Sequence, residues 1–187
     1  MKENTFFKRS KILEDNQDYL IDSVSIISKV FIEVINKGGK LIFAGNGGSA
    51  AEAQHMSAEY VGTLVTSNKR DPISAIALSA DTSFITAWAN DHGYEDIFRR
   101  QLQALGKEND CFVSYSTSGQ SENIIRAIDY ANSIGIKTIS FTGSKNSEVS
   151  KKSFFTFKAP SDETALIQEL HTIVGHEICS VIDKEFS

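Results

Sequence analysis

His55 and Glu59 stand four residues apart, directly after a glycine-rich segment, and together they could move a proton. On a helix this spacing places both side chains on one face, near the helix end that follows the glycines. An imidazole beside a carboxylate is suited to general acid–base catalysis. The alternative interpretation is an exposed helix pair of the kind that is common on protein surfaces.

Polar side chains also interrupt the otherwise aliphatic helix predicted over residues 162–184. Gln168 and His176 are eight residues apart, which is about 80° around a helix, so they share one broad face. Polar groups on an apolar helix need hydrogen-bond partners. Gln168, His171 and His176 are therefore either ligand-binding residues or satisfied polar residues of a core or an interface.

The glycine-rich segment is Gly45-Asn46-Gly47-Gly48-Ser49, and it joins a predicted strand to a helix that starts near Ala50. Glycines allow a sharp turn and close approach of a ligand, and the helix N-terminus that follows favours a phosphate or another anion. The spacing also fits a relaxed dinucleotide fingerprint. The acidic residue that this fingerprint requires about twenty positions later is missing, which argues against a nucleotide cofactor.

A second turn, Ser116-Thr117-Ser118-Gly119-Gln120-Ser121, follows another predicted strand and precedes a helix from Glu122. Its hydroxyls and the helix N-terminal amides could hold a monophosphate without a lysine. The alternative is that Ser121 is a helix N-cap and that the other residues only form the turn. Two such turns after two strands favour a ligand, and they favour a sugar phosphate over a dinucleotide.

Short apolar segments alternate with helical patterns along the chain and must position these residues. Strands are predicted at 40–44, 73–78, 111–115, 138–141 and 154–157. Nearly continuous apolar strands that alternate with helices predict an α/β fold with a parallel sheet, covered on both faces and binding ligands at the carboxyl ends of the strands.

A helix is predicted over 19–37, ending at Gly38 and Gly39, and its apolar stripe is wide for a helix with one buried face. One domain has limited surface against which to bury such a stripe, so we expect this helix to pack in an oligomer. The stripe comprises Leu20, Ile21, Val24, Ile27, Val30, Phe31, Val34 and Ile35.

The composition, 187 residues with 41% hydrophobic and 23% charged side chains, is that of one globular domain. A net charge of −5 disfavours binding to nucleic acid or to an anionic membrane. Cys111 and Cys179 are too few and too far apart for a disulfide framework or a zinc ribbon, and they indicate thiols in a reducing cytoplasm. No apolar segment has the length or flanks of an export signal or a membrane span.

Three segments, Gly45-Asn46-Gly47-Gly48-Ser49, Ser116-Thr117-Ser118-Gly119 and Ile167-Gln168-Glu169-Leu170-His171, resemble the sugar isomerase (SIS) family and, within it, the phosphoheptose isomerase branch. The resemblance covers nearly the whole chain. The combination of the serine turn with His55-x-x-x-Glu59 and the Gln168 to His176 spacing is more specific than the turn alone.

The resemblance implies a single SIS domain over 1–187, with a flavodoxin-like five-stranded parallel sheet flanked by helices and an added N-terminal helix. Residues 1–38 would be a helical segment that packs in a homotetramer, and residues 39–187 would be the α/β core. The active sites would lie between subunits. The implied reaction is the isomerisation of sedoheptulose 7-phosphate to heptose 7-phosphate, for bacterial lipopolysaccharide.

The resemblance also implies a role for each matching residue. Glu59 would remove the proton next to the carbonyl, and His176 would act on the oxygens or return a proton, through an enediol. His55, Glu59, Gln168 and His176 together form a plausible zinc site. The implied substrate-binding residues are Asn46, Gly47, Gly48, Ser49, Asp91, Ser116, Thr117, Ser118, Ser121 and Gln168.

Two positions depart from the family pattern, since Leu166 and Thr63 stand where many members have arginine. These departures leave the identity of the sugar phosphate open. Three alternatives to the expected activity remain: isomerisation of a related sugar phosphate, a non-catalytic paralogue that binds a replication-initiator protein, and a nicotinamide-dependent oxidoreductase. The presence of Glu59, which such paralogues lack, favours the isomerase.

Overall fold

Five apolar segments form the all-parallel sheet that the sequence predicts, which confirms the α/β fold class. The computed structural model describes residues 5–67 and 69–187. The strand order is β2-β1-β3-β4-β5, and every neighbouring pair is parallel. The strands are β1 (Leu41–Gly45), β2 (Ala75–Ala77), β3 (Cys111–Ser116), β4 (Lys137–Thr142) and β5 (Phe155–Lys158).

This strand order places the two predicted turns next to each other. The chain leaves β1 toward β2 on one side and returns to β3 on the other, so the connections after β1 and β3 diverge from a common crevice. In flavodoxin-like sheets, ligands bind at this switch point, outside the carboxyl ends of the strands. The glycine turn follows β1 and the serine turn follows β3, so both lie at the switch point.

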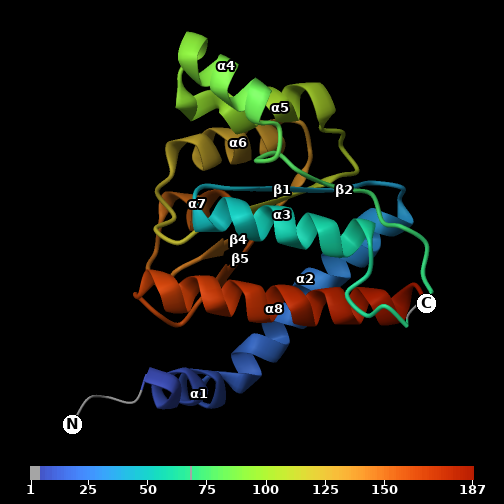
Figure 1. Ribbon diagram of the computed structural model, residues 1–187, viewed down its shortest axis with the longest axis vertical. Coiled ribbons are helices and arrows are strands. Elements are labelled where there is room, and N and C mark those ends of the chain that lie inside the picture. The colour runs from blue at the N-terminus through green and yellow to red at the C-terminus, as the bar shows by residue number, and fades with distance from the viewer. Residues whose placement is uncertain (1–4, 68) are drawn as a thin grey trace.

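Helices cover both faces of the sheet (Figure 1). On one face, α2 (Gln17–Asn36), α3 (Gly48–Val61) and α8 (Thr164–Glu185) pack against alternate strand residues such as Phe43, Val113 and Phe141. On the other face, α5 (Ile97–Leu105) and α6 (Glu122–Ser133) pack against Ile42 and Phe112. The elements α4 (Thr82–His92), η1 (Tyr94–Asp96) and α7 (Glu148–Lys152) also lie on that second face, where η1 packs against α6.

The N-terminal segment contains two helices where the sequence predicts one. The predicted helix is α2, and a separate helix, α1 (Thr5–Asp15), precedes it with no residue buried. Figure 1 shows α1 and the first turns of α2 extending past α8, away from the sheet. Within the described ranges, the helices are all too short or too polar to cross a membrane.

Candidate active site

The α3 and α8 helices lie side by side and run in the same direction, which brings the predicted site residues together (Figure 1). Successive contacts pair Gly48 with Gln168, His55 with His176, and Thr63, just beyond α3, with Asp183. The partner residues are separated by nearly the same sequence distance at each contact. The two helices therefore share one register, and residues from both meet at each level.

Glycine at position 48 allows Gln168 to lie on the first turn. A Cβ at this position would come within 2.5 Å of Gln168 Nε2, so a larger residue would displace the amide. The preceding Gly47 occupies the N-cap of α3 with a φ of 57°, a conformation that favours glycine. The glycine turn that the sequence predicts therefore leads into a helix N-terminus and allows α8 to approach closely. Ser49 is buried in the first turn of α3.

The two turns are joined by a pair of side-chain amides that sequence reasoning missed. Asn46 Nδ2 donates to Asn123 Oδ1 at 2.9 Å, and Asn123 Nδ2 donates to Asn46 Oδ1 at 2.9 Å. Tyr94 Oη also donates to Asn46 Oδ1 at 2.9 Å. Asn123 lies in the first turn of the helix that follows the serine turn, which places it near the site, but nothing local in the sequence indicates its partner. These bonds fix the first turn relative to α6 and η1.

In the second turn, Ser121 occupies the N-cap position of α6 but its side chain makes no capping hydrogen bond. Its Oγ lies 3.0 Å from Ser116 Oγ instead. Thr117 and Ser118 line a polar cavity of about 290 Å³ that Lys145 and Asp162 also line. The serine turn therefore opens onto a solvent-accessible hollow, with a cationic side chain at its edge.

His55, Glu59 and His176 form a group that we term the imidazole cluster. The Nε2 atoms of His55 and His176 lie 2.7 Å apart, so the two rings share one hydrogen bond. His55 Nδ1 lies 3.7 Å from Glu59 Oε1. Within the described chain, the surface pair His55 and Glu59 thus becomes part of a three-residue cluster because α8 supplies the second imidazole.

The contact between His55 and His176 requires α3 and α8 to pack closely, and Gly175 of α8 allows this close packing. A Cβ at position 175 would lie 2.7 Å from the sulfur of Met56, a buried residue of α3. Glycine inside a helix ordinarily costs stability. Here it lets α3 and α8 approach at the level of His55 and His176.

Glu52, one turn before His55 on α3, is a further acidic residue at this interface that the sequence did not single out. Its Oε2 accepts a hydrogen bond from Thr172 Oγ1 at 2.7 Å, whereas its Oε1 is buried and has no hydrogen-bond partner among the described residues. Burial raises the pKa of Glu52, and the Thr172 hydrogen bond and the nearby charges of His55 and His176 oppose that rise.

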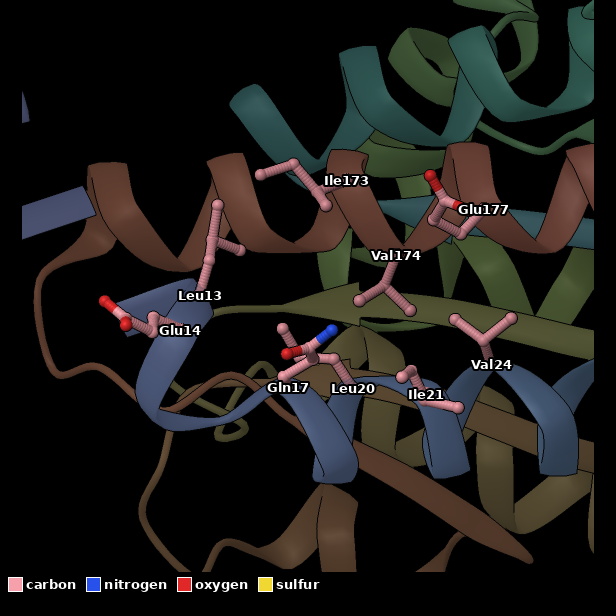
Figure 2. A pocket seen from close by; sticks show the side chains of 9 residues that line it. All are labelled: Leu13, Glu14, Gln17, Leu20, Ile21, Val24, Ile173, Val174 and Glu177. Carbon is pink, nitrogen blue, oxygen red and sulfur yellow. The ribbon is translucent and has the colours of Figure 1, made fainter. Parts of the chain in front are cut away.

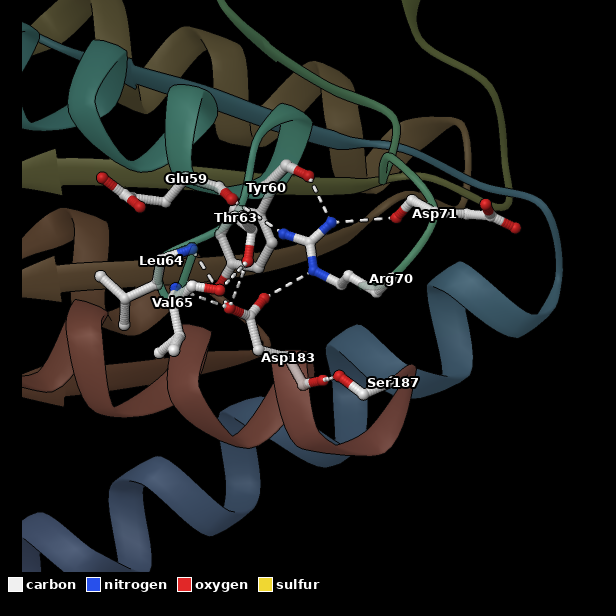
Figure 3. A network of polar contacts seen from close by, with 9 residues as sticks. All are labelled: Glu59, Tyr60, Thr63, Leu64, Val65, Arg70, Asp71, Asp183 and Ser187. Atoms are coloured by element: carbon white, nitrogen blue, oxygen red, sulfur yellow. Dashed lines mark hydrogen bonds and ion pairs between the residues drawn. The ribbon is translucent and has the colours of Figure 1, made fainter. Parts of the chain in front are cut away.

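A buried ion pair secures the end of α3 that carries Glu59 (Figure 3). Arg70 Nε donates to Asp183 Oδ1 at 2.5 Å, and the guanidinium also donates to the carbonyl oxygens of Glu59 and Tyr60 at 2.8 and 3.0 Å. Thr63 Oγ1 donates to Asp183 Oδ2 at 2.9 Å. We term this set of Arg70, Asp183 and Thr63 the clamp. Thr63, one of the two positions singled out in the sequence, thus has a structural contact of its own.

Burial alone would raise the pKa of Asp183. Hydrogen bonds from Arg70, Thr63 and the Val65 N–H outweigh that effect and hold the pKa of this carboxyl below its usual value. The carboxylate is therefore retained in its charged form inside the protein.

Three further residues that the sequence singled out lie outside the cluster. His171 is buried, and its Nε2–H donates to the Thr142 carbonyl at 3.1 Å, so it is the satisfied core residue that the sequence left as an alternative. Burial lowers the pKa of His171 to about 4. Asp91 is exposed in the last turn of α4, where its carboxylate accepts a hydrogen bond from Asn90 Nδ2. Leu166, at the other departure from the family pattern, is buried.

The cluster has the chemistry of a zinc site, since imidazole and carboxylate groups are zinc ligands and Gln168 adds an amide oxygen. Zinc binds imidazole nitrogen at about 2.0–2.1 Å in tetrahedral geometry, which requires the two Nε2 atoms to lie farther apart than their present 2.7 Å. Across residues 5–67 and 69–187, no group of three or more His, Cys, Asp or Glu side chains is arranged to hold a metal ion. The donor types fit zinc, and the two rings would have to separate to receive it.

Comparison with known proteins gives the same family from sequence and from structure. Residues 6–143 match the SIS domain. The chain is 43% identical over 166 residues to the phosphoheptose isomerase of Leptospira biflexa, covering 89% of this chain and 85% of that protein. It is 41% identical over 177 residues to the phosphoheptose isomerase of Helicobacter pylori, covering 95% and 89%.

Solved structures agree with the sequence relatives. The phosphoheptose isomerase of Francisella tularensis superposes with a TM-score of 0.91 at 32% identity, covering 98% of this chain and 97% of that one. The enzyme of Neisseria gonorrhoeae superposes with a TM-score of 0.86 at 32% identity, covering 96% and 95%. The chain belongs to the SIS domain family and, within it, to the phosphoheptose isomerases.

Proposed function

We propose that this protein interconverts sedoheptulose 7-phosphate and D-glycero-D-manno-heptose 7-phosphate by proton transfer through an enediol. The observation that carries the proposal is the imidazole cluster, which α8 and α3, the helix that follows the glycine turn, form between them. Relatives of this chain at 43% and 41% identity are phosphoheptose isomerases. The product would supply heptose for lipopolysaccharide or another surface polysaccharide.

The phosphate of the substrate is held by the serine turn. Ser116, Thr117, Ser118 and Ser121 offer hydroxyl donors, and the N-terminus of α6 adds backbone N–H groups and the positive end of its dipole. Asn46 and Ser49 of the first turn and Asp91 of α4 bind the sugar hydroxyls. Neutral donors suit a chain whose net charge is −5.

Proton transfer uses the two helices together. Glu59 removes the proton from C1 of the ketose, which forms the enediol as the carbonyl oxygen at C2 receives a proton from His176. His176 then takes the proton of the C1 hydroxyl, and Glu59 returns its proton to C2, which yields the aldose. Each residue ends the cycle in the protonation state in which it began.

Zinc, held by His55, Glu59, Gln168 and His176, would polarise the sugar carbonyl when bound. The test of this assignment is zinc binding by calorimetry to the metal-free protein. Binding should be lost in His55→Ala and retained in His171→Gln, which replaces a histidine outside the cluster.

Replacement of Glu59 tests the reaction. We expect Glu59→Gln to lower kcat/KM on sedoheptulose 7-phosphate by about 10²–10⁴-fold, the usual contribution of a general base, with an unchanged melting temperature. His176→Ala should act in the same way. Glu185→Gln, an exposed carboxylate at the end of α8, is the matched control and should retain full activity. Unchanged turnover in both cluster variants would refute the assigned roles.

The choice of sugar is tested with a panel of five-, six- and seven-carbon ketose phosphates, with and without a chelator. Thr63 is bound in the clamp and Leu166 is buried, so neither offers the cation that many relatives have there. Turnover of a shorter sugar in preference to the heptose would assign the related isomerase activity. Absence of turnover on every sugar, with capture of a replication protein, would favour the non-catalytic alternative.

An apolar groove supports assembly into a homotetramer. Figure 2 shows the groove between the α1–α2 segment and α8, with a volume of about 580 Å³. Ile21 and Ile173 on its walls are 57% and 39% exposed. Neighbouring copies would cover this surface, and residues 1–38 would supply the contact while residues 39–187 form the α/β core.

The free, buried Cys111 and Cys179 support a reducing cytoplasm as the location.

Sedimentation tests the assembly. We expect a tetramer at micromolar concentration, and Ile21→Glu should dissociate it. Lys29→Glu, on the same helix but outside the groove, should leave it intact. A wild-type protein that sediments only as a monomer would refute the assembly.

A further inference from the structure

Among the described residues, the buried Oε1 of Glu52 has no hydrogen-bond partner, and the mechanism above does not use this residue. Glu52 lies on α3 one turn before His55 and two turns before Glu59, so the three side chains share one helix face. One carboxylate oxygen is bound by Thr172, and the other is buried without a partner among the described residues. An unpaired buried acceptor costs free energy in this state of the protein, and a functional role is one reason to retain it.

Thr172 places this carboxylate between the elements of the site. It lies on α8 one turn after Gln168 and one turn before His176, and its hydroxyl is also 3.2 Å from the Gln168 carbonyl. The Glu52 to Thr172 bond therefore joins α3 to α8 in the same register as the contact between His55 and His176. A Cβ at Gly175 would lie 3.6 Å from Glu52 Oε1, an ordinary contact distance, so this oxygen lies against α8 beside the residue that precedes His176.

The charge of Glu52 matters to the two imidazoles. Each of them interacts electrostatically with the carboxylate. In the proposed cycle His176 is an imidazolium before it protonates the carbonyl oxygen and again after it takes the C1 hydroxyl proton, and a preorganised carboxylate nearby stabilises that cation. An acidic residue that orients a catalytic imidazole without itself exchanging a proton is a known arrangement.

We propose that Glu52 is a positioning residue of the isomerase site. Thr172 anchors the Glu52 carboxylate to α8, and the free oxygen and negative charge of that carboxylate hold the His55–His176 pair in the orientation that proton transfer requires. Glu52 neither gains nor loses a proton in the cycle. The inference rests on the proposed function, and it adds a residue pair, Glu52 and Thr172, to that site.

The kinetic test uses Glu52→Gln, which keeps the shape and an acceptor for Thr172 but removes the charge. We expect kcat on sedoheptulose 7-phosphate to fall by about 10²-fold, as for loss of catalytic geometry, while KM changes by less than about twofold and the melting temperature does not fall. Thr172→Val should lower kcat by about tenfold, and Thr172→Ser should restore it because the hydroxyl is retained. Wild-type kcat in Glu52→Gln, or a loss that follows a fall in melting temperature, would overturn the proposal.

A second readout does not depend on turnover. In protein labelled with ¹⁵N-histidine, the ring signals of His55 and His176 should shift in Glu52→Gln and in Thr172→Val, and return in Thr172→Ser. The signal of the buried His171 is the internal control and should stay in place. Unmoved signals of His55 and His176 would overturn the positioning role, even if the wild-type protein proved inactive on every sugar tested, a result that would count against the proposed function alone.

Discussion

The interface between α3 and α8 contains two polar groups of opposite character. In the clamp, the side chains of Arg70 and Asp183 are 0% and 1% exposed, and both carboxylate oxygens accept hydrogen bonds. In the imidazole cluster, the His55 side chain is 43% exposed, and Oε1 of the neighbouring Glu52 has no hydrogen-bond partner among the described residues. The clamp has its hydrogen-bonding capacity filled, whereas the cluster keeps donors and acceptors available for a ligand.

We infer that the clamp supports the stability of the helix pair, whereas the imidazole cluster supports its activity. Substitutions in the clamp should lower the free energy of unfolding, because they leave buried charges or carbonyls without partners. Substitutions in the cluster should lower turnover and leave stability nearly unchanged.

Loss of Asp183 should have the largest effect. Asp183→Ala leaves the buried Arg70 guanidinium uncompensated, and removing one partner of a buried ion pair costs about 3–5 kcal/mol of unfolding free energy. Urea denaturation measures this loss. Asp129→Ala breaks an exposed ion pair with Lys152 and is the control, with an expected loss of under about 1 kcal/mol. Equal losses in the two variants would remove the distinction between the clamp and an ordinary surface pair.

His171 should make stability depend on pH. Its folded pKa of about 4 lies below the unfolded value of about 6.5, so the unfolded state binds the proton first as the pH falls. Stability is therefore present above pH 6.5 and declines toward pH 4, with a loss of about 2 kcal/mol between pH 7 and pH 5 from this residue. Urea denaturation at both pH values, compared with His171→Gln, isolates the contribution. Identical pH dependence in the two proteins would contradict it.

Gly175→Ala should affect activity more than stability. The added methyl group meets the Met56 sulfur at 2.7 Å, so the buried Met56 side chain must shift, and we expect this to push α3 and α8 apart where His55 contacts His176. We expect kcat to fall by about tenfold and the unfolding free energy by about 1 kcal/mol. The double variant Gly175→Ala/Met56→Ala, which removes the overlap, should recover part of the lost kcat. Full activity in Gly175→Ala would show that the helix spacing does not control the cluster.

Local patterns in the sequence predicted most of the fold. Apolar strands and helical periodicity predicted all five strands, α2 and α8, because those signals depend on residues close together in the chain. The same reasoning missed α1, which buries no residue and therefore has little periodic signal. It also made β2 three residues too long, because this strand lies at the sheet edge and pairs with β1 alone.

The site was predictable only where its residues are close in sequence. The two turns and the pairing of His55 with Glu59 follow from glycine, serine and helical spacing, and a resemblance to known sequences linked them to Gln168 and His176. No local pattern indicates that Asn123 pairs with Asn46 or that Thr172 pairs with Glu52. Those pairs are 77 and 120 residues apart in the chain.

The sequence by itself determined the α/β layering, the two turns after β1 and β3 and the residue types proposed for proton transfer, since each of these follows from local conformational preference and burial. The tertiary structure alone decided the parallel register of α3 and α8. That register depends on the close approach at Gly175 and on the clamp between Arg70 and Asp183. Packing between segments distant in the chain sets this register. The same packing places His176 against His55 to form the imidazole cluster, and it buries Glu52 Oε1 without a hydrogen-bond partner among the described residues.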